Sequence, residues 1–306
     1  MTARPLPAPG RHGGDGAKLA AALGIPASHV LDLSLSLNPS APDVVAMVAR
    51  HATSVRHYPD DTAARDALAT AMAVDPERLV LTNGGAEAIA LVAAHMPVGD
   101  VAVPDFSLYE KHLTSVRSGA PRWRSNPNNP TGRLAAADDV AEVWDEAFYP
   151  LATGAWTRGD AGAIVVGSLT KIFACPGLRV GYVLAPTGGH ARAFAARQPE
   201  WSVNSLACAI VPELVESADV PLWARTIAKR RGQLDVVLRD QGLEPDHSDA
   251  NYVLVRHAPG VRNHLAGRRV LVRDTTSFGI PEGVRIAVPD DAGLDRLALA
   301  LDGWNA

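Results

Sequence analysis

Lysine and cysteine are both scarce in this sequence. Only four of its 29 basic residues are lysines, namely Lys18, Lys111, Lys171 and Lys229. The two cysteines, Cys175 and Cys208, have neither the spacing of metal ligands nor that of a redox pair. No His-x-x-x-His pair lies in a helical metal-binding motif, so we expect no metal site. A reducing, cytoplasmic location fits this composition best.

Three further absences exclude broad classes of function. No run approaches the roughly 18 apolar residues that a membrane helix needs. The N-terminal residues MTARPLPAPGRHGGDG contain no apolar stretch, so we expect no secretory signal. The net charge of -4 gives no basic surface, which argues against nucleic acid as a partner.

The order of the expected elements predicts an α/β fold. Helical spacing of apolar residues marks 17–23, 43–50, 62–73, 86–96, 222–240 and 292–302. Short apolar runs predict strands at 78–82, 100–104, 141–145, 163–167 and 179–185, and later at 251–256, 269–273 and 284–288. The stretch LDLSLSLNPSAP (31–42) alternates like a strand and ends in an Asn-Pro turn. Helices that alternate with short apolar strands favour a mainly parallel sheet.

This order also divides the chain into three parts. We expect an N-terminal arm over 1–42 that packs with the small domain, a large domain over 43–205, and a smaller α+β domain over 206–306.

Lys171 stands out because of its surroundings in GSLTKIFACPGLRVGY (167–182). It follows a buried-strand pattern, whereas the other three lysines lie in polar or helical stretches. A lysine at a strand end can simply extend its ammonium into solvent. A lysine that forms a Schiff base must instead be partly desolvated, so that its amine is neutral and nucleophilic. Ser168, Thr170 and Arg179 are the hydroxyls and the guanidinium that a phosphate on the aldehyde would need.

A second anion-binding element precedes this segment. TNGGAEA (82–88) predicts a strand, a Gly-Gly turn and a helix, so the backbone N–H groups at Gly85 and Ala86 could hold a dianion at a helix N-terminus. A lone Gly-Gly before a helix is weak evidence. Together with the Lys171 segment it indicates a phosphate site.

Three other segments add groups that suit an aromatic aldehyde cofactor. In NPNNPTG (126–132), Asn129 could donate to a phenolic oxygen, although the segment could also be only a turn. In WDEAF (144–148), Asp145 could pair with a protonated pyridine nitrogen, or could be a helix cap. In VPDFSLY (103–109), Phe106 could stack on a flat ring, or could pack in the core.

The order of these motifs resembles a known family. GGAE, PDF, NPNNPTG, DEAF, SLTK and GLR follow one another between about residues 80 and 185, as in the fold type I pyridoxal 5′-phosphate enzymes of the class I/II aminotransferase branch. The resemblance implies this cofactor, its attachment to Lys171, and a sheet of the seven-stranded type with a smaller C-terminal domain.

Two branches of the family share further segments with the chain. In RHYPD (56–60), the resemblance implies that Tyr58 reaches the cofactor phosphate of a neighbouring subunit, and therefore a homodimer with a shared site. The segments RHGGDG, LGIP, EWSVNSLA (200–207) and VLVRDTTSFGIPEGVRIAV (270–288) are similar to the threonine-phosphate decarboxylases of cobalamin synthesis. So is Phe148, where histidinol-phosphate aminotransferases have tyrosine.

By this resemblance four residues would bind the substrate. Arg285 would hold the substrate carboxylate and Arg273 its phosphate, with Asn38 and His12 nearby. Either arginine alone would more simply be a surface charge, because the chain has so many.

The chain also departs from the family pattern. Only APRWRS joins Gly119 to the Asn-Pro segment, and twelve residues separate Gly132 from Asp145. We therefore expect a fold trimmed by one or two peripheral helices and an edge of the sheet. This leaves three functions open: a decarboxylase of a small phosphorylated amino acid such as threonine phosphate, an aminotransferase of the histidinol-phosphate or aromatic type, and a trimmed, non-catalytic pyridoxal-binding protein.

Overall fold

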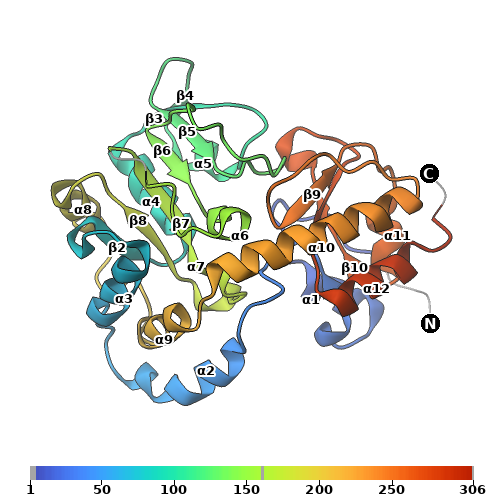
Figure 1. The fold of residues 1–306 in the computed structure, drawn as a ribbon, viewed down its shortest axis with the longest axis horizontal. Helices are drawn as coiled ribbons and strands as arrows, with labels where there is room; N and C mark the ends of the chain where they lie inside the picture. The colour runs from blue at the N-terminus through green and yellow to red at the C-terminus, as the bar shows by residue number, and fades with distance from the viewer. Residues whose placement is uncertain (1–4, 160–161, 305–306) are drawn as a thin grey trace.

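The structure is a computed structural model of the chain and describes residues 5–159 and 162–304. Two units lie side by side, one around a large sheet and one around a small sheet, and the long helix α10 (Val220–Asp240) runs along both (Figure 1). The first four residues of the expected N-terminal arm and the last two of the expected C-terminal domain lie outside the described residues.

The large unit is built around a sheet of seven strands in the order β2-β8-β7-β6-β5-β3-β4. Along the chain these strands are β2 (Leu79–Thr82), β3 (Val98–Val101), β4 (Ser115–Val116), β5 (Arg122–Ser125), β6 (Val143–Asp145), β7 (Ile164–Ser168) and β8 (Gly181–Leu184). β8 runs antiparallel to both of its neighbours, β2 and β7, and the other pairs are parallel. The predicted α/β fold with a mainly parallel sheet is confirmed.

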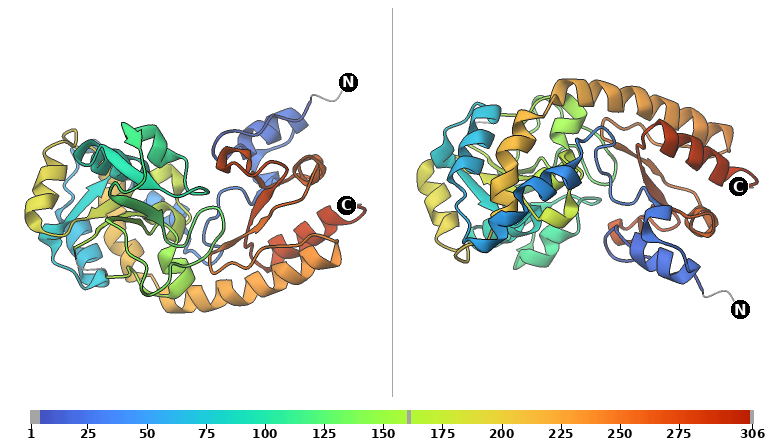
Figure 2. Two further views of the ribbon diagram at one scale, coloured as in Figure 1. Left: turned by 90° about the horizontal axis from the view of Figure 1, so that it is seen from above. Right: turned by 90° about the horizontal axis from the view of Figure 1, so that it is seen from below.

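Helices cover this sheet on both faces because its central strands are apolar on both sides. The residues of β6 and β8 are all buried, which is typical of strands between two layers of helices. One face packs against α4 (Gly85–His95), α5 (Leu108–His112) and α8 (Gly188–Ala195). The other packs against α2 (Val44–His51), α3 (Thr62–Met72), α6 (Tyr149–Thr153), α7 (Leu169–Ile172) and α9 (Ser205–Glu216). Figure 2 shows these layers from above and below.

The shortening of the chain falls on helices, while the sheet keeps seven strands. The stretch APRWRS, which we interpreted as a bare connection, contains the strand β5. The burial of this strand alternates, since Trp123 and Ser125 are buried and Arg122 is exposed. Between β5 and β6, residues 126–142 form turns and extended chain without a helix.

The small unit combines the two ends of the chain. Its sheet has the order β11-β12-β9, made of β9 (Tyr252–Val255), β11 (Arg273–Asp274) and β12 (Val284–Ala287). Its helices are α1 (Gly16–Leu23), α11 (Val261–Gly267) and α12 (Asp291–Leu301). A separate parallel pair joins β1 (Leu31–Asp32) to β10 (Val270–Leu271), so the N-terminal arm packs on this unit, as Figure 2 also shows.

The N-terminal arm is less regular than its alternating sequence predicts. Only Leu31–Asp32 of the expected strand over 31–42 joins a ladder. The chain beyond it connects the two units: the backbone N–H of Leu33 donates to the carbonyl of Leu271, and that of Asn38 donates to the carbonyl of Lys171. Because the backbone of this segment bonds first to the small unit and then to the large unit, it cannot continue to pair with one neighbouring strand.

Core packing continues the large unit past residue 205. Val211 and Leu214 of α9 and Ile227 of α10 belong to the core under the large sheet. Leu234 and Leu238, further along α10, belong to the core of the small unit. The two cores therefore meet within α10, later than the boundary that we expected from the sequence.

In the described part of the chain, no helix is both long and apolar enough to cross a membrane. Residues 5–159 and 162–304 also contain no group of three or more His, Cys, Asp or Glu side chains that could hold a metal ion.

Candidate active site

A cavity of about 400 Å³ lies where the two units meet, and Lys171 is in its wall. The apolar strand β7 ends at Ser168, and the four-residue helix α7 then places Lys171 beside the N-terminal arm. Its Nζ donates to the carbonyl oxygen of Leu35, 3.0 Å away. Burial, followed by the charges of Arg285 and Arg179, lowers the pKa of Lys171 to about 8. A neutral, nucleophilic amine is therefore accessible near physiological pH.

Donors for an anion gather at one end of the cavity. The hydroxyls of Ser168 and Thr170 lie 2.8 Å apart, and both residues line the cavity together with Arg179. Gly85 and Ala86, at the N-terminus of the eleven-residue helix α4, line the same end. Hydroxyls, a guanidinium and free helix N–H groups form a site suited to a phosphate.

Two glycines allow this close arrangement. Gly84 has φ of 77°, and a β-carbon there would overlap the guanidinium of Arg179. A β-carbon on Gly181 would lie 2.6 Å from the backbone nitrogen of Gly85. Side chains at either position would push Arg179 or strand β8 away from the helix N-terminus.

Asp145 lies in another part of the cavity wall, at the end of β6. Tyr109 donates its hydroxyl to Oδ2 of Asp145 at 2.8 Å, and the backbone N–H of Ala147 donates to Oδ1 at 3.0 Å. Burial raises the pKa of Asp145. A cationic partner in the cavity would offset the cost of this buried carboxylate.

Asn129 and Arg285 contact each other in the cavity wall. The guanidinium of Arg285, from β12, donates to Oδ1 of Asn129. It also lies over the ring of Tyr252, 4.5 Å from the centroid, and its Nε has no hydrogen-bond partner among the described residues. Burial lowers the pKa of Arg285. This arginine is a buried cation with capacity for an anionic ligand.

Arg273 approaches the cavity from the neighbouring strand β11, directly opposite Arg285 in the ladder. Its guanidinium donates to the carbonyl oxygens of Gly10, at 2.9 Å, and Arg11. Burial and the charge of Arg285 lower its pKa to about 10. Arg273 thus fixes the N-terminal arm over the cavity.

His12 and Phe106 meet at the edge of the cavity. Both line it, and their ring centroids are 6.1 Å apart. Burial, followed by Arg273, lowers the pKa of His12. The predicted stacking residue Phe106 is therefore close enough to contact a ring bound in the cavity.

Two of the residues expected in the site do not line the cavity. Asn38 is buried and donates through Nδ2 to the carbonyl of Ile172 at 2.9 Å, so it holds the backbone beside Lys171. Tyr58 is 77% exposed and stacks on Trp201, with ring centroids 4.5 Å apart.

Two structural features of the site were missed in the sequence. Tyr109 bonds to Asp145, and its position three residues after Phe106 could have suggested a shared face. The carbonyl of Leu35 that accepts from Lys171 belongs to the backbone, which leaves no sequence signal.

Phe148 is buried against Tyr252, with ring centroids 5.1 Å apart.

Comparison with known proteins decides the family. The sequence model of the aminotransferases of class I and II matches residues 123–301. The chain belongs to this family. It is therefore a pyridoxal 5′-phosphate enzyme, a transferase or a lyase, with the fold of the type I group.

Curated relatives of this family member include two histidinol-phosphate aminotransferases. Histidinol-phosphate aminotransferase 1 of Dechloromonas aromatica is 28% identical, over 93% of this chain and 92% of the relative. Histidinol-phosphate aminotransferase 2 of Methylococcus capsulatus is 27% identical, over 89% of this chain and 90% of the relative.

Solved structures share the fold of this family member. The histidinol-phosphate aminotransferase of Clostridium acetobutylicum has a TM-score of 0.79 at 23% identity, covering 90% of this chain and 98% of its own. The L-threonine-O-3-phosphate decarboxylase of Porphyromonas gingivalis has a TM-score of 0.76 at 22% identity, covering 89% and 98%. The histidinol-phosphate aminotransferase of Sinorhizobium meliloti, solved with pyridoxal 5′-phosphate, has a TM-score of 0.73 at 18% identity, covering 87% and 88%.

The residues of the cavity fit this cofactor. An anion site, an amine with a lowered pKa and a buried carboxylate line one cavity, as a phosphate, an aldehyde and a pyridine nitrogen require. The shortened stretch leaves both Asn129 and Asp145 among the residues that line this cavity. The missing helices, which prompted the non-catalytic alternative, therefore do not displace these two residues.

Proposed function

We propose that this enzyme acts on a small amino acid that carries a phosphate, and that it removes the carboxyl group as CO₂, as a threonine-phosphate decarboxylase does. The observation that carries the proposal is the pair of buried arginines on adjacent strands, Arg273 and Arg285. Two like charges side by side in a cavity wall are costly unless anions compensate them. A substrate with a carboxylate and a phosphate supplies two.

Each residue then has a definite task. Bound pyridoxal phosphate supplies an electron-withdrawing ring that stabilises negative charge on the substrate carbon. Lys171 holds the cofactor aldehyde and afterwards carries a proton on Nζ. Asp145 keeps a proton on the ring nitrogen, Asn129 donates to the ring oxygen, and Phe106 covers one face. Ser168, Thr170 and Arg179 bind the cofactor phosphate.

Arg285 would decide which bond breaks, because it holds the substrate carboxylate. By anchoring that carboxylate, Arg285 would set the orientation of the bond between the substrate's α-carbon and its carboxyl group relative to a bound cofactor. Arg273 would bind the substrate phosphate next to His12, exchanging some of its bonds to the N-terminal arm for bonds to the ligand.

Transamination of histidinol phosphate is the second candidate, and the names of the curated relatives favour it. Histidinol phosphate has a phosphate but no carboxylate. In that reaction Arg285 would bind the carboxylate of the amino acceptor 2-oxoglutarate.

One experiment separates the two reactions. Purified protein with pyridoxal phosphate is incubated with threonine phosphate alone, and separately with histidinol phosphate plus 2-oxoglutarate, and products are identified by mass. Loss of 44 mass units (CO₂) from threonine phosphate without an acceptor is expected from the chemistry of decarboxylation. Glutamate formation in the second mixture alone would establish the aminotransferase instead.

We also propose a homodimer with a shared site. The exposed apolar side chains of Val45, Val55, Tyr58 and Trp201 come from segments next to α2 and α9. Beside them lies a hollow of about 450 Å³, lined in part by Pro59 and Trp201. A second copy would cover this surface and would bring its Tyr58 to the cofactor phosphate.

A further inference from the structure

Asp105 is a buried carboxylate that has no role in the function proposed above. It is 8% exposed and lies between β3 and α5, outside the lining of the cofactor cavity. It accepts hydrogen bonds from the backbone N–H of Phe106 at 2.7 Å, from that of Ser125 at 3.2 Å, and from the hydroxyl of Ser125. Burial raises its pKa to about 7. A group so costly to bury is compensated here by three donors.

The contacts of Asp105 continue to two residues that do line the cavity. Phe106 is its neighbour in the chain. The hydroxyl of Ser125, at the end of β5, accepts from the backbone N–H of Asn129 at 2.8 Å. Asp105 therefore precedes Phe106 directly in the chain. Only the Ser125 hydroxyl lies between the Asp105 carboxylate and the backbone N–H of Asn129.

A further bond joins the same two segments. Nδ2 of Asn128 donates to the carbonyl of Pro104 at 3.1 Å. The Asn-Pro loop is therefore fixed to residues 104–106 by side chains, over a part of the sheet where no helix follows β5. Asp105 accepts three hydrogen bonds at this junction.

We propose that Asp105 is a positioning residue, which sets Asn129 through the Ser125 hydroxyl and Phe106 through its backbone, so that both contact one bound cofactor ring. This inference rests on the proposed roles of Asn129 and Phe106 in cofactor binding. Asp105 touches neither cofactor nor substrate; it fixes the distance between the residue at the ring edge and the residue on the ring face.

Two variants test the proposal. Asp105→Asn keeps the volume but directs an amide N–H₂ group at donors of Ser125. Ser125→Ala removes only the hydroxyl between Asp105 and Asn129. The matched control is Asp100→Asn on β3, because Asp100 also accepts from a backbone N–H, that of Gly119 at 3.0 Å, and does not line the cavity.

The measurements are the dissociation constant of pyridoxal phosphate and the visible circular dichroism of the bound cofactor, with the thermal midpoint of the apoprotein as a separate measure of folding. We expect both test variants to weaken cofactor binding about tenfold, the scale of one hydrogen bond to a charged group, and the control to stay within about twofold. We also expect the circular dichroism of the bound cofactor to change in both test variants, because the ring sits differently, and not in the control.

Two outcomes would count against the inference. If Asp105→Asn and Ser125→Ala bind the cofactor with wild-type affinity and wild-type circular dichroism, Asp105 does not position the ring. If Asp105→Asn fails to fold, Ser125→Ala decides alone. A wild-type chain that binds no pyridoxal phosphate would overturn the proposed function as well, and that result is distinct from unaltered variants of a wild type that binds.

Discussion

The two walls of the cavity are built in different ways. The lysine side, residues 163–185, consists of two buried strands around a short helix, with apolar layers on both faces. The asparagine side, residues 122–145, has two strands joined by a loop without a helix. The first wall is held by its own core. The second depends on polar contacts with neighbouring segments.

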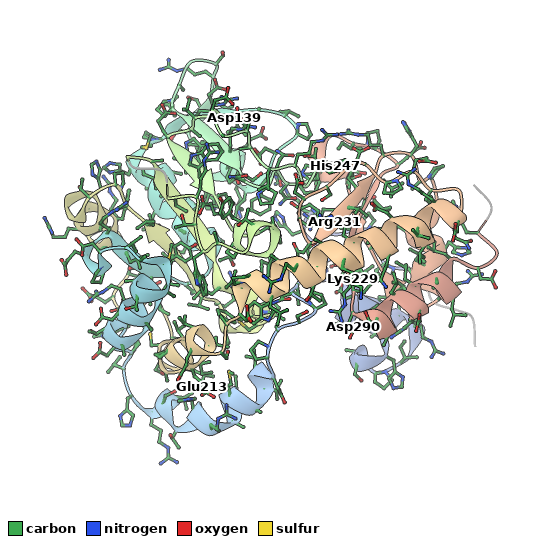
Figure 3. The ribbon with its side chains drawn as sticks, viewed as in Figure 1. Asp139, Glu213, Lys229, Arg231, His247 and Asp290 are labelled. Atoms are coloured by element: carbon green, nitrogen blue, oxygen red, sulfur yellow. The ribbon has the colours of Figure 1, made fainter. Side chains whose placement is uncertain are left out.

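The small unit supplies many of those contacts. The backbone N–H of Asp249 donates to the carbonyl of Gly132 at 2.8 Å, and Oδ2 of Asp249 accepts from the backbone N–H of Leu134 at 3.0 Å. Arg231 on α10 in turn donates to the carbonyl of Asp249 at 2.8 Å, close to the segment that carries His247 (Figure 3). Where a peripheral helix is absent, the second unit holds the loop that carries Asn129.

The largest expected effect lies on the lysine side. Lys171→Ala should abolish both turnover and the visible absorbance of lysine-bound cofactor, because Lys111, the other lysine that lines the cavity, comes from α5 and not from the segment that carries Ser168 and Thr170. The fold should persist, as shown by an unchanged far-ultraviolet spectrum. Lys229→Ala, on the exposed face of α10, is the control and should behave like the wild type. Turnover near the wild-type level in the Lys171 variant would remove the lysine from the mechanism.

Asp145 lies at the end of the asparagine side. Its loss should lower the turnover rate and leave cofactor binding intact. Asp145→Ala should retain the cofactor, since the anion end and Lys171 are intact. Its turnover should fall on the order of 100-fold or more, because the ring nitrogen loses the group that keeps it protonated. Asp139→Ala, which breaks a 2.8 Å ion pair with Arg124 on the same side, is the control for general damage. Equal turnover in the two variants would exclude a specific role for Asp145.

The dependence of the asparagine side on the small unit can be tested at Gly132. Its φ is 75°, and a β-carbon there would overlap the hydroxyl of Ser248. Gly132→Ala should lower the free energy of unfolding by about 1–3 kcal/mol through backbone strain and overlap, measured by urea titration.

Gly119→Ala is the matched control for Gly132→Ala. Gly119 has φ of 79° with no atom within 4 Å of an added β-carbon, so its variant suffers the strain without the overlap. Adding Ser248→Ala should restore part of the stability of Gly132→Ala. Equal losses at both glycines, or no restoration, would mean that the contact with the small unit is unimportant.

The same contrast explains what the sequence could predict. The lysine side was predictable because its apolar runs and its motif lie within one continuous segment, and the structure places Ser168, Thr170 and Lys171 together in the cavity wall. On the asparagine side, β5 was missed because two arginines hid the alternation of RWRS. The contact between Gly132 and Ser248 joins residues more than a hundred positions apart, and no local pattern reveals such a pairing.

The protonation state of Lys171 should have a smaller effect, on the rate at which the apoprotein reacts with its cofactor. The pKa of Lys171 lies near 8 in the folded apoprotein, below its usual 10.5, so the amine is protonated below pH 8 and neutral above it. The rate at which the apoprotein reacts with pyridoxal phosphate should therefore rise about tenfold from pH 7 to pH 9, with a midpoint near 8. Absorbance measured by stopped flow follows this rate. A rate that is flat over this range would show that the amine is already neutral at pH 7.

The linked effect on stability has the same sign. Between pH 8 and 10.5 the unfolded chain binds a proton at Lys171 that the folded chain lacks, so this residue makes the unfolding free energy of the apoprotein rise with pH across that window. A comparison of wild type with Lys171→Ala isolates this contribution.

The smallest expected effect concerns Tyr58, which lies in neither wall of the cavity. Tyr58 is exposed beside Trp201, and in a homodimer it would donate to the cofactor phosphate held by Ser168, Thr170 and Arg179 of the other subunit. Tyr58→Phe should weaken cofactor affinity by about 1 kcal/mol, the scale of one hydrogen bond. Fluorescence titration of the apoprotein with pyridoxal phosphate measures it. Trp201→Phe, which keeps an aromatic neighbour, should leave the affinity unchanged.

Mixing inactive chains tests whether Tyr58 acts on the other subunit's site. A hybrid of Tyr58→Ala with Lys171→Ala has one site with both substitutions and one site with neither, because each site takes its lysine from one chain and its tyrosine from the other. Part of the wild-type activity should therefore return on mixing at a cofactor concentration that loads the wild type but not Tyr58→Ala, where neither variant is active alone. If Tyr58 served the site of its own chain, both hybrid sites would be defective and nothing would return. A fully active monomer by light scattering at working concentration would remove the shared site altogether.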